Sequence, residues 1–230
     1  MTSLCEELQK RANPEKARVL QRFFKTGKGE YGEGDVFLGI TVPQSRAIAE
    51  QFAHIELKDV KKHLQSKMHE ERLVALLVLV EKYKKSDDKK EIADFYLSNT
   101  KHINNWDLVD LTADKILGDY LFDKDKCIIY ELVKSSNLWE RRIAIVSTFN
   151  FIKQRKFDET LRLAEMLLHD KHDLIHKACG WMLREVGKKD EKVLRDFLKK
   201  NYKHMPRTML RYAIERFPEV KRKSYLAGAV

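Results

Sequence analysis

The residues best suited to chemistry lie in a short stretch near the middle of the chain. Residues 104–114, NNWDLVDLTAD, contain one tryptophan and three acids. Two asparagines precede Trp106 and are good N-cap residues, so we expect a helix to begin there, with Asp107 and Asp114 facing water. Asp110 is different because its neighbours are apolar, and burying an unpaired carboxylate costs several kcal/mol or forces protonation. The sequence therefore predicts that Asp110 either has a compensating partner or faces a cleft.

The types of residue around Asp110 indicate which chemistry it could perform. Trp106 lies four residues earlier and shares its helix face. A second tryptophan, Trp181, lies near Arg184, and Arg142 lies between the two regions. Tryptophan is more often a core residue than a ligand contact, but an aromatic ring face attracts a cation by about 0.5 to 2 kcal/mol. Together these residues favour binding of a polyanion that carries a localised positive charge.

The elements that position these residues are predicted to be helices throughout. Apolar residues recur every three and four positions, and no window alternates as a strand does. One example is an apolar stripe flanked by charged residues that we expect to lie outside it: the stripe is Leu73, Leu76, Leu77, Val80 and Tyr83, and the charged residues are Glu70, Glu71, Lys82 and Lys84. Trp139 is expected to be a core residue. The fold class is therefore predicted to be all-α.

Three segments of the chain resemble one another and indicate repeats. They are EERLVALLVLV from Glu70, WERRIAIVSTF from Trp139 and LIHKACGWMLR from Leu174, and they place Arg72, Arg141 and His176 in matching positions. The stretch around Asp107 lies in register between the first two. One aligned column is apolar throughout, and the next contains three small residues and one acid: the columns are Val74, Val109, Ile143, Ala178 and Ala75, Asp110, Ala144, Cys179. Such spacing predicts one domain, residues 1–230, an α-solenoid of HEAT-like repeats that is curved and has a concave basic face.

Composition restricts the class of protein further. The chain has 230 residues, 45 Lys plus Arg against 35 Asp plus Glu, and a net charge of +10. This balance favours a phosphate-rich partner, and the scarcity of aromatic residues between the basic clusters favours duplex over single-stranded DNA. The three cysteines form no CxxC pair, which favours a reducing compartment. Without a signal peptide or an apolar run long enough for a membrane helix, we expect a cytoplasmic monomer that does not bind membranes.

Other motifs carry weaker signals. The segment TGKGEYGEGD, beginning at Thr26, lacks the spacing of a phosphate-binding loop and contains acids, so we interpret it as a flexible connector between helices. His169, His172, His176 and Cys179 have spacings that could bind zinc on one helix face, but neighbouring aspartates favour helix capping there. HEER at His69 differs from the HExxH metalloprotease motif. No metal site and no cofactor are expected.

The quoted segments resemble those of a known family, the bacterial DNA alkylation repair glycosylases of the AlkD type. The matching segments are WDLVD at 106–110, LWERRIAI at 138–145, KACGWMLRE at 177–185, DVFLGITVPQSR at 35–46 and NPEKA at 13–17. They cover nearly the whole chain in order. The resemblance implies a HEAT-like fold and removal of cationic N3- and N7-alkylated purines from duplex DNA, without flipping the lesion into a pocket.

The resemblance also implies roles for individual residues. Asp110 would be the catalytic carboxylate, and Trp106 and Trp181 would flank the sugar of the damaged nucleotide. Arg142 would hold DNA phosphates near the lesion, and Arg184 is a less direct match.

One position departs from the family pattern. Phe23 stands where we expect a tyrosine, so this chain lacks a hydroxyl that the DNA-contacting position would otherwise carry.

The implied chemistry agrees with the presence of a single anomalous acid. An alkylated purine is already cationic and leaves without a general acid, so the barrier lies in the oxocarbenium-like sugar. One carboxylate and two ring faces can stabilise that charge, and the carboxylate can orient water. The alternative, from a different class, is a HEAT-like scaffold that binds DNA or protein without catalysis. The joint presence of Trp106, Asp110 and Trp181 favours the enzyme.

Overall fold

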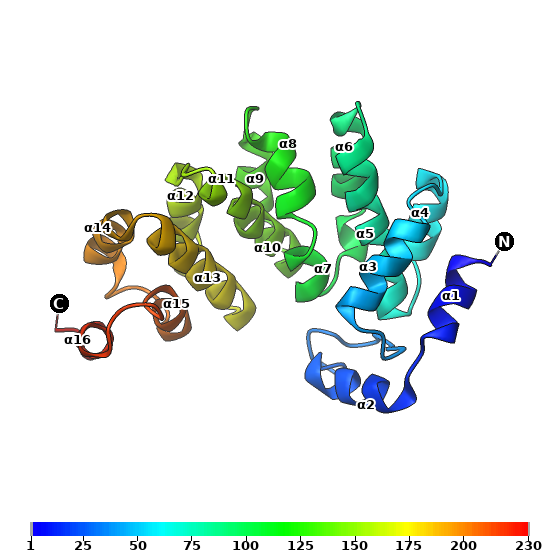
Figure 1. Ribbon diagram of the computed structural model, residues 1–230. Coiled ribbons are helices and arrows are strands. Elements are labelled where there is room, and N and C mark those ends of the chain that lie inside the picture. Colours follow the sequence, from blue (N-terminus) through cyan, green and yellow to red (C-terminus); the bar gives the residue numbers. More distant parts are fainter. Residues whose placement is uncertain (1, 230) are drawn as a thin grey trace. The chain divides into compact units, whose positions relative to one another are not determined.

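The computed structural model describes residues 2–229, and within that range the regular elements are helices without strands (Figure 1). Within these residues, an isolated β-bridge joins Val36 and Met68. The predicted all-α class is therefore confirmed, and the succession of helices is of the α-solenoid type. In residues 2–229, no helix combines the length and the apolar character needed to cross a lipid bilayer. The curvature of the array and its basic concave face stay predictions.

Contacts between Cα atoms divide the chain into two compact units, Met1–Thr112 and Ala113–Val230. The single-domain assignment of residues 1–230 stays a prediction. The first unit contains α1 (Leu4–Lys10), α2 (Pro14–Phe23), α3 (Val42–Gln51), α4 (Leu57–Leu64), α5 (His69–Lys85), α6 (Lys89–Ser98), η1 (Thr100–His102) and α7 (Trp106–Asp110).

Helix α5 is the centre of the first unit. Residues 73–80 are all buried, which is wider than the single apolar stripe expected from the sequence. A helix that is apolar around its whole circumference must be covered on all sides. Helices α3, α4, α6 and α7 provide that cover, and Figure 1 shows α3 and α4 beside α5.

Helix α13 has the corresponding place in the second unit, where α10, α14 and α15 pack against it. Trp139, on α10, is buried as expected. The elements of this unit are η2 (Asp114–Gly118, a π-helical turn), α8 (Asp119–Leu121), α9 (Cys127–Leu132), α10 (Leu138–Ser147), α11 (Phe149–Lys153), α12 (Asp158–Met166), α13 (Asp173–Lys189), α14 (Glu191–Asn201), α15 (Arg207–Ala213) and α16 (Glu219–Ala227).

The aligned repeats share one hydrogen bond, at the corners that precede helices α5, α10 and α13. Arg72 donates to the carbonyl of Ser66 at 2.8 Å, and Arg141 donates to the carbonyl of Ser135 at 2.9 Å. His176 Nε2 makes the same contact with the carbonyl of Asp170 at 2.5 Å. In each repeat the acceptor lies six residues before the donor. The column identified from the sequence is thus also a structural equivalence.

The next column contains the small residues. Ala75, Ala144 and Cys179 are completely buried where their helices pack closely. Asp110 occupies the fourth place in this column but is only half-buried, at the last residue of α7. A carboxylate is tolerated there because the short helix ends at Asp110 and leaves the side chain partly in contact with water.

The expectation that Asp114 faces water is wrong. Asp114 begins the π-helical turn η2 and is 4% exposed. Its Oδ2 lies 2.6 Å from Nζ of Lys153 on α11, which compensates the buried charge. Helix α11 packs against η2, so the first residue of this turn meets Lys153 rather than water.

Candidate functional site

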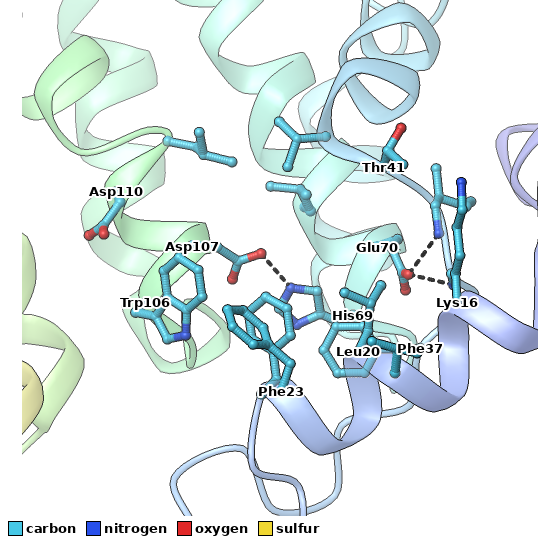
Figure 2. Close-up of a pocket in the computed structure, with 17 residues that line it drawn as sticks. Lys16, Leu20, Phe23, Phe37, Thr41, His69, Glu70, Trp106, Asp107 and Asp110 are labelled. Carbon is cyan, nitrogen blue, oxygen red and sulfur yellow. Dashed lines mark hydrogen bonds and ion pairs between the residues drawn. The ribbon is translucent and has the colours of Figure 1, made fainter.

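A pocket of about 440 Å³ lies within the first unit (Figure 2). Its walls come from α2, α5, α7 and the extended segment around residue 40. The lining is predominantly apolar and aromatic, with three acids and one histidine among its polar members. The aromatic, acidic and histidine members of this lining are Phe23, Phe24, Phe37, His69, Glu70, Trp106, Asp107 and Asp110.

Stacked rings form one wall of this pocket. The ring of Trp106 stacks on Phe24 with centroids 5.0 Å apart and planes 10° from parallel. Phe24 stacks on Phe37 at 4.8 Å, and Phe37 stacks on the imidazole of His69 at 4.4 Å. Phe23 meets Trp106 edge-on at 5.9 Å and is 61% exposed. Stacking of this kind favours one ring orientation, so Phe24 and Phe23 orient the ring of Trp106 in the pocket lining.

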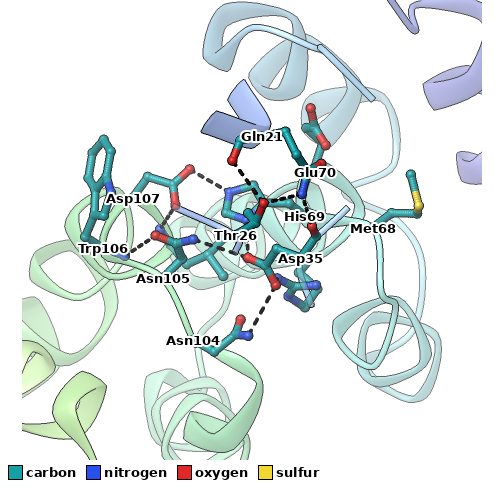
Figure 3. A network of polar contacts seen from close by, with 12 residues as sticks. Gln21, Thr26, Asp35, Met68, His69, Glu70, Asn104, Asn105, Trp106 and Asp107 are labelled. Carbon is teal, nitrogen blue, oxygen red and sulfur yellow. Dashed lines mark hydrogen bonds and ion pairs between the residues drawn. The ribbon is translucent and has the colours of Figure 1, made fainter. Parts of the chain in front are cut away.

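His69 lies between two carboxylates. Its Nε2 is 2.8 Å from Oδ2 of Asp107, and its Nδ1 is 3.1 Å from Oδ2 of Asp35 (Figure 3). Burial by itself lowers the pKa of His69, but the charge of Asp107 and hydrogen bonds from both carboxylates outweigh it and raise the pKa to about 9. The ring is therefore an imidazolium at neutral pH, and both of its nitrogens donate.

Asp35 joins this pair to a second cation. Arg72 donates to its Oδ1 at 2.6 Å, and the side-chain amide of Asn105 donates to its Oδ2 at 3.2 Å. Burial raises the pKa of Asp35, but the hydrogen bond from His69 and the charge of Arg72 dominate, so its pKa lies below the usual value. Two carboxylates thus balance His69 and Arg72, which is the condition under which four buried charges are tolerated.

Local backbone structure explains why these side chains meet. The bridge between residues 36 and 68 brings the start of α5 against the segment that follows Asp35, with the amide of His69 donating to the carbonyl of Val36 at 2.8 Å. Asn105 caps α7 by accepting from the amide of Trp106 at 2.8 Å. Its side chain therefore both begins α7 and donates to Asp35. Asn105 therefore orients the helix that carries Trp106.

The expectation that Asp107 faces water is wrong. Asp107 is 6% exposed, and its carboxylate contacts His69 and accepts from the amide of Leu108 at 2.9 Å. A first-turn acid normally needs no partner beyond the helix amides. Here α7 begins directly over the N-terminus of α5, so the first-turn position points into the protein toward His69.

Asp110 lies one helical turn beyond Asp107 and lines the same pocket. It is half-buried at the C-terminal end of α7, on the same side as Trp106 (Figure 2). The predicted proximity of Asp110 and Trp106 on one helix face agrees with this placement. The catalytic role of each stays a prediction.

Glu70 was expected outside the apolar stripe of α5, and that expectation is wrong. It is 1% exposed and accepts from three successive backbone amides: Leu38 at 2.9 Å, Gly39 at 2.8 Å and Ile40 at 3.1 Å. The segment around residue 40 has no strand partner for these amides, so the carboxylate satisfies them. Glu70 thereby fixes the backbone that forms the far wall of the pocket.

The other residues implied by the resemblance lie in the second unit. Trp181, on α13, is half-buried and contacts Phe149 at a centroid distance of 5.7 Å. Arg142, on α10, is 5% exposed and donates to the carbonyl of Leu174 at 2.5 Å. Arg184 is half-buried and forms an ion pair with Glu215.

The motifs judged weaker have structural roles. A helix begins at this point, but the N-cap of α13 is His172 rather than one of the neighbouring aspartates, and its Nδ1 accepts from the amide of Leu174 at 3.2 Å. Asp170 accepts from the amide of His172 at 2.8 Å, just before the helix. The glycine-rich connector forms turns in which Glu30 and Glu33 accept from the amides of Gly27 and Gly29.

Sequence reasoning missed His69, Asp35 and Arg72 as a cluster. One signal was present, because Arg72 occupied a repeat column with Arg141 and His176. The partner Asp35 lies 34 residues from His69, and no local pattern connects the two.

Comparisons with family models and with solved structures both found matches to this chain. The model of the DNA alkylation repair enzyme family matches residues 4–217, so the chain belongs to this family, and the resemblance seen in the sequence is confirmed. A predicted DNA alkylation repair enzyme from Enterococcus faecalis has the same fold at a TM-score of 0.70 and 17% identity, covering 91% of this chain and 98% of that one. AlkD2 from Streptococcus mutans gives a TM-score of 0.59 at 22% identity, covering 89% and 98%. A comparison with curated proteins found no match.

Proposed function

We propose that the protein is a DNA glycosylase that hydrolyses the N-glycosidic bond of cationic N3- and N7-alkylated purines in duplex DNA, without flipping the base. The observation that carries the proposal is the placement of Asp110: a half-buried carboxylate beside Trp106, at a position where the other repeats bury small residues. Membership of the DNA alkylation repair enzyme family supports the choice of substrate class.

The three acids that line the pocket differ in what they can do. Asp107 is buried against His69, and Glu70 is buried against three backbone amides. Neither can approach a nucleotide without breaking those contacts. Asp110 is more exposed than either, so it is the acid that we assign to the sugar.

The chemistry requires stabilisation of positive charge rather than protonation of the leaving base. As the glycosidic bond breaks, charge develops on the sugar ring, and a preorganised carboxylate stabilises it. The electron-rich face of Trp106 acts in the same direction and cannot rotate away, because Phe24 stacks on it. The carboxylate of Asp110 then orients water for attack on the anomeric carbon.

The remaining roles follow from the family resemblance. Trp181 would contact the sugar of the damaged nucleotide, and Arg184 would contact a DNA phosphate. Arg142 is 5% exposed and donates to the carbonyl of Leu174, so it would reach a phosphate only by giving up that contact. The net charge of +10 supports binding to DNA. Phe23, exposed beside Trp106, would contact DNA through its ring, since it carries no hydroxyl. The chemistry requires no cofactor, and we propose that the active form is a monomer.

The test is release of 7-methylguanine from methylated duplex DNA. We expect the wild-type protein to release the base and Asp110→Asn to be slower by roughly 100-fold or more. DNA binding, measured by gel shift, should be retained by the variant. Asp94→Asn changes an exposed acid on α6 and serves as the matched control, with unchanged release. A wild-type protein that binds DNA but releases no base would exclude the glycosylase and favour the scaffold.

A further inference from the structure

Three potential metal ligands from three helices meet on the first unit, outside the pocket described above. Cys5 belongs to α1, His63 to α4 and Glu71 to α5. Their ligand atoms, one from each residue, all lie within 4.8 Å of one another. We propose that these residues bind one divalent transition-metal ion of the zinc type, with a water molecule completing the coordination.

One of the interatomic distances matches a tetrahedral zinc site, and another is shorter. With zinc bonds of about 2.3 Å to sulfur and about 2.1 Å to nitrogen and oxygen, tetrahedral ligands lie roughly 3.4 to 3.6 Å apart. Cys5 Sγ is 3.5 Å from Oε1 of Glu71, which agrees with this separation. His63 Nδ1 is 2.8 Å from the same oxygen, so an ion entering the site needs a small outward rotation of the imidazole.

The chemical types of the three ligand atoms also suit zinc. Zinc is bound by thiolate, imidazole and carboxylate, and a site with three protein ligands and one water is a common arrangement. Soft sulfur and borderline nitrogen disfavour Mg²⁺ and Ca²⁺, which prefer oxygen ligands. Ser66 donates to the other carboxylate oxygen, Oε2, at 2.6 Å and leaves Oε1 directed at the cluster. A hydrogen bond to the outer oxygen is how ligating carboxylates are usually oriented.

The repeat architecture shows which part of this cluster is additional. Ser135 and Glu140 repeat the contact of Ser66 with Glu71 at the equivalent corner. The position equivalent to His63, 69 residues further on as Ser135 is from Ser66, is Leu132, a buried apolar residue. The serine–glutamate contact therefore belongs to the general repeat corner. The imidazole and the thiol are additions to it.

The site is also accessible from solvent. Cys5 is exposed, and His63 and Glu71 are half-buried, so an ion can reach the three ligand atoms. The bound ion would connect α1 to α4 and α5.

The experiment is a zinc titration of metal-depleted protein that carries no histidine tag, in competition with a chromophoric chelator. We expect one equivalent of zinc per chain and a thermal midpoint that rises with free zinc. Cobalt should produce a thiolate-to-metal charge-transfer band, which reports directly on a cysteine ligand. Absence of stoichiometric zinc binding by the wild-type protein would overturn the proposal, whatever the result of the glycosylase assay.

Variants identify the ligands. Cys5→Ser and His63→Ala should each weaken zinc binding at least tenfold, and Cys5→Ser should remove the cobalt band. Cys127→Ser is the matched control, because Cys127 is also exposed and lies in the other unit. It should bind zinc and cobalt as the wild type does. Zinc binding that survives Cys5→Ser, or is lost in Cys127→Ser, would place the ion elsewhere and contradict the assignment.

Discussion

His69 and Asp107 form a buried ion pair that joins the first turn of α5 to the first turn of α7, with Nε2 and Oδ2 2.8 Å apart. Both residues line the pocket that contains Trp106 and Asp110. The pair therefore fixes the helix that carries the proposed catalytic carboxylate. It acts on the position of α7 rather than on substrate.

Removing one partner of this pair should destabilise the protein strongly. We expect Asp107→Asn to lower the free energy of unfolding by about 3 to 5 kcal/mol, because it leaves the His69 imidazolium without its closest counter-charge. Urea denaturation followed by circular dichroism measures the change. Asp123→Asn, at an exposed position, is the control and should unfold close to the wild-type midpoint. Equal midpoints for the two variants would show that the His69–Asp107 ion pair contributes little to stability.

The same pair predicts a dependence of stability on pH. The pKa of His69 rises from 6.5 when unfolded to about 9 when folded, so the folded state binds the proton more tightly. The resulting stabilisation is complete below pH 6.5 and is lost as pH rises through 9, by on the order of 3 kcal/mol. Denaturation at intervals between pH 6 and pH 10 measures it. His69→Gln should lose this slope, and a variant with the wild-type slope would assign the titration to other groups.

Alanine substitutions of two adjacent phenylalanines should have different effects, one on stability and the other on base release. Phe24 is 6% exposed within the ring stack, so Phe24→Ala should cost about 3 to 5 kcal/mol of stability. Phe23 is 61% exposed, so Phe23→Ala should change stability by about 1 kcal/mol or less and reduce base release several-fold. Val220→Ala, at an exposed apolar residue on α16 that does not line the pocket, is the control for Phe23 and should retain activity. Full activity of Phe23→Ala would remove this residue from the proposed DNA contact.

Alanine substitutions at two glycines distinguish the cost of backbone strain from the cost of a steric clash. Gly39 and Gly34 have φ angles of +84° and +86°, so alanine at either should cost about 1 to 2 kcal/mol. A Cβ at Gly39 would also lie 2.1 Å from the carbonyl oxygen of Asn13, whereas a Cβ at Gly34 meets nothing within 4 Å. We expect Gly39→Ala to be less stable than Gly34→Ala by a further 1 to 3 kcal/mol in urea denaturation. Similar midpoints would mean that the backbone around Asn13 moves freely.

The repeat pattern made much of the fold predictable. Periods of three and four residues indicated helices, and the equivalence of Arg72, Arg141 and His176 appeared as a column before it appeared as a shared contact with the carbonyl six residues earlier. The anomaly of Asp110 came from the same comparison. These signals are local or periodic, so one chain is enough to detect them.

The interior of the site was not predictable in the same way. We expected the side chain of Asp107 to face water and that of Glu70 to lie outside the apolar stripe of its helix. Both side chains are buried, because segments distant in sequence supply their hydrogen-bond partners. Helical periodicity predicts which residues share a face but does not specify what covers that face. A charged residue therefore looks solvated until its partner is known.

The sequence by itself determined the helical class, the repeat register, the family and the pairing of Trp106 with Asp110 on one helix face. Only the tertiary structure showed that Asp35, His69, Arg72 and Asp107 form one balanced buried group and that Cys5, His63 and Glu71 meet. Side-chain types and spacing are encoded along the chain. Burial and charge compensation arise only when separate helices bring their ends together.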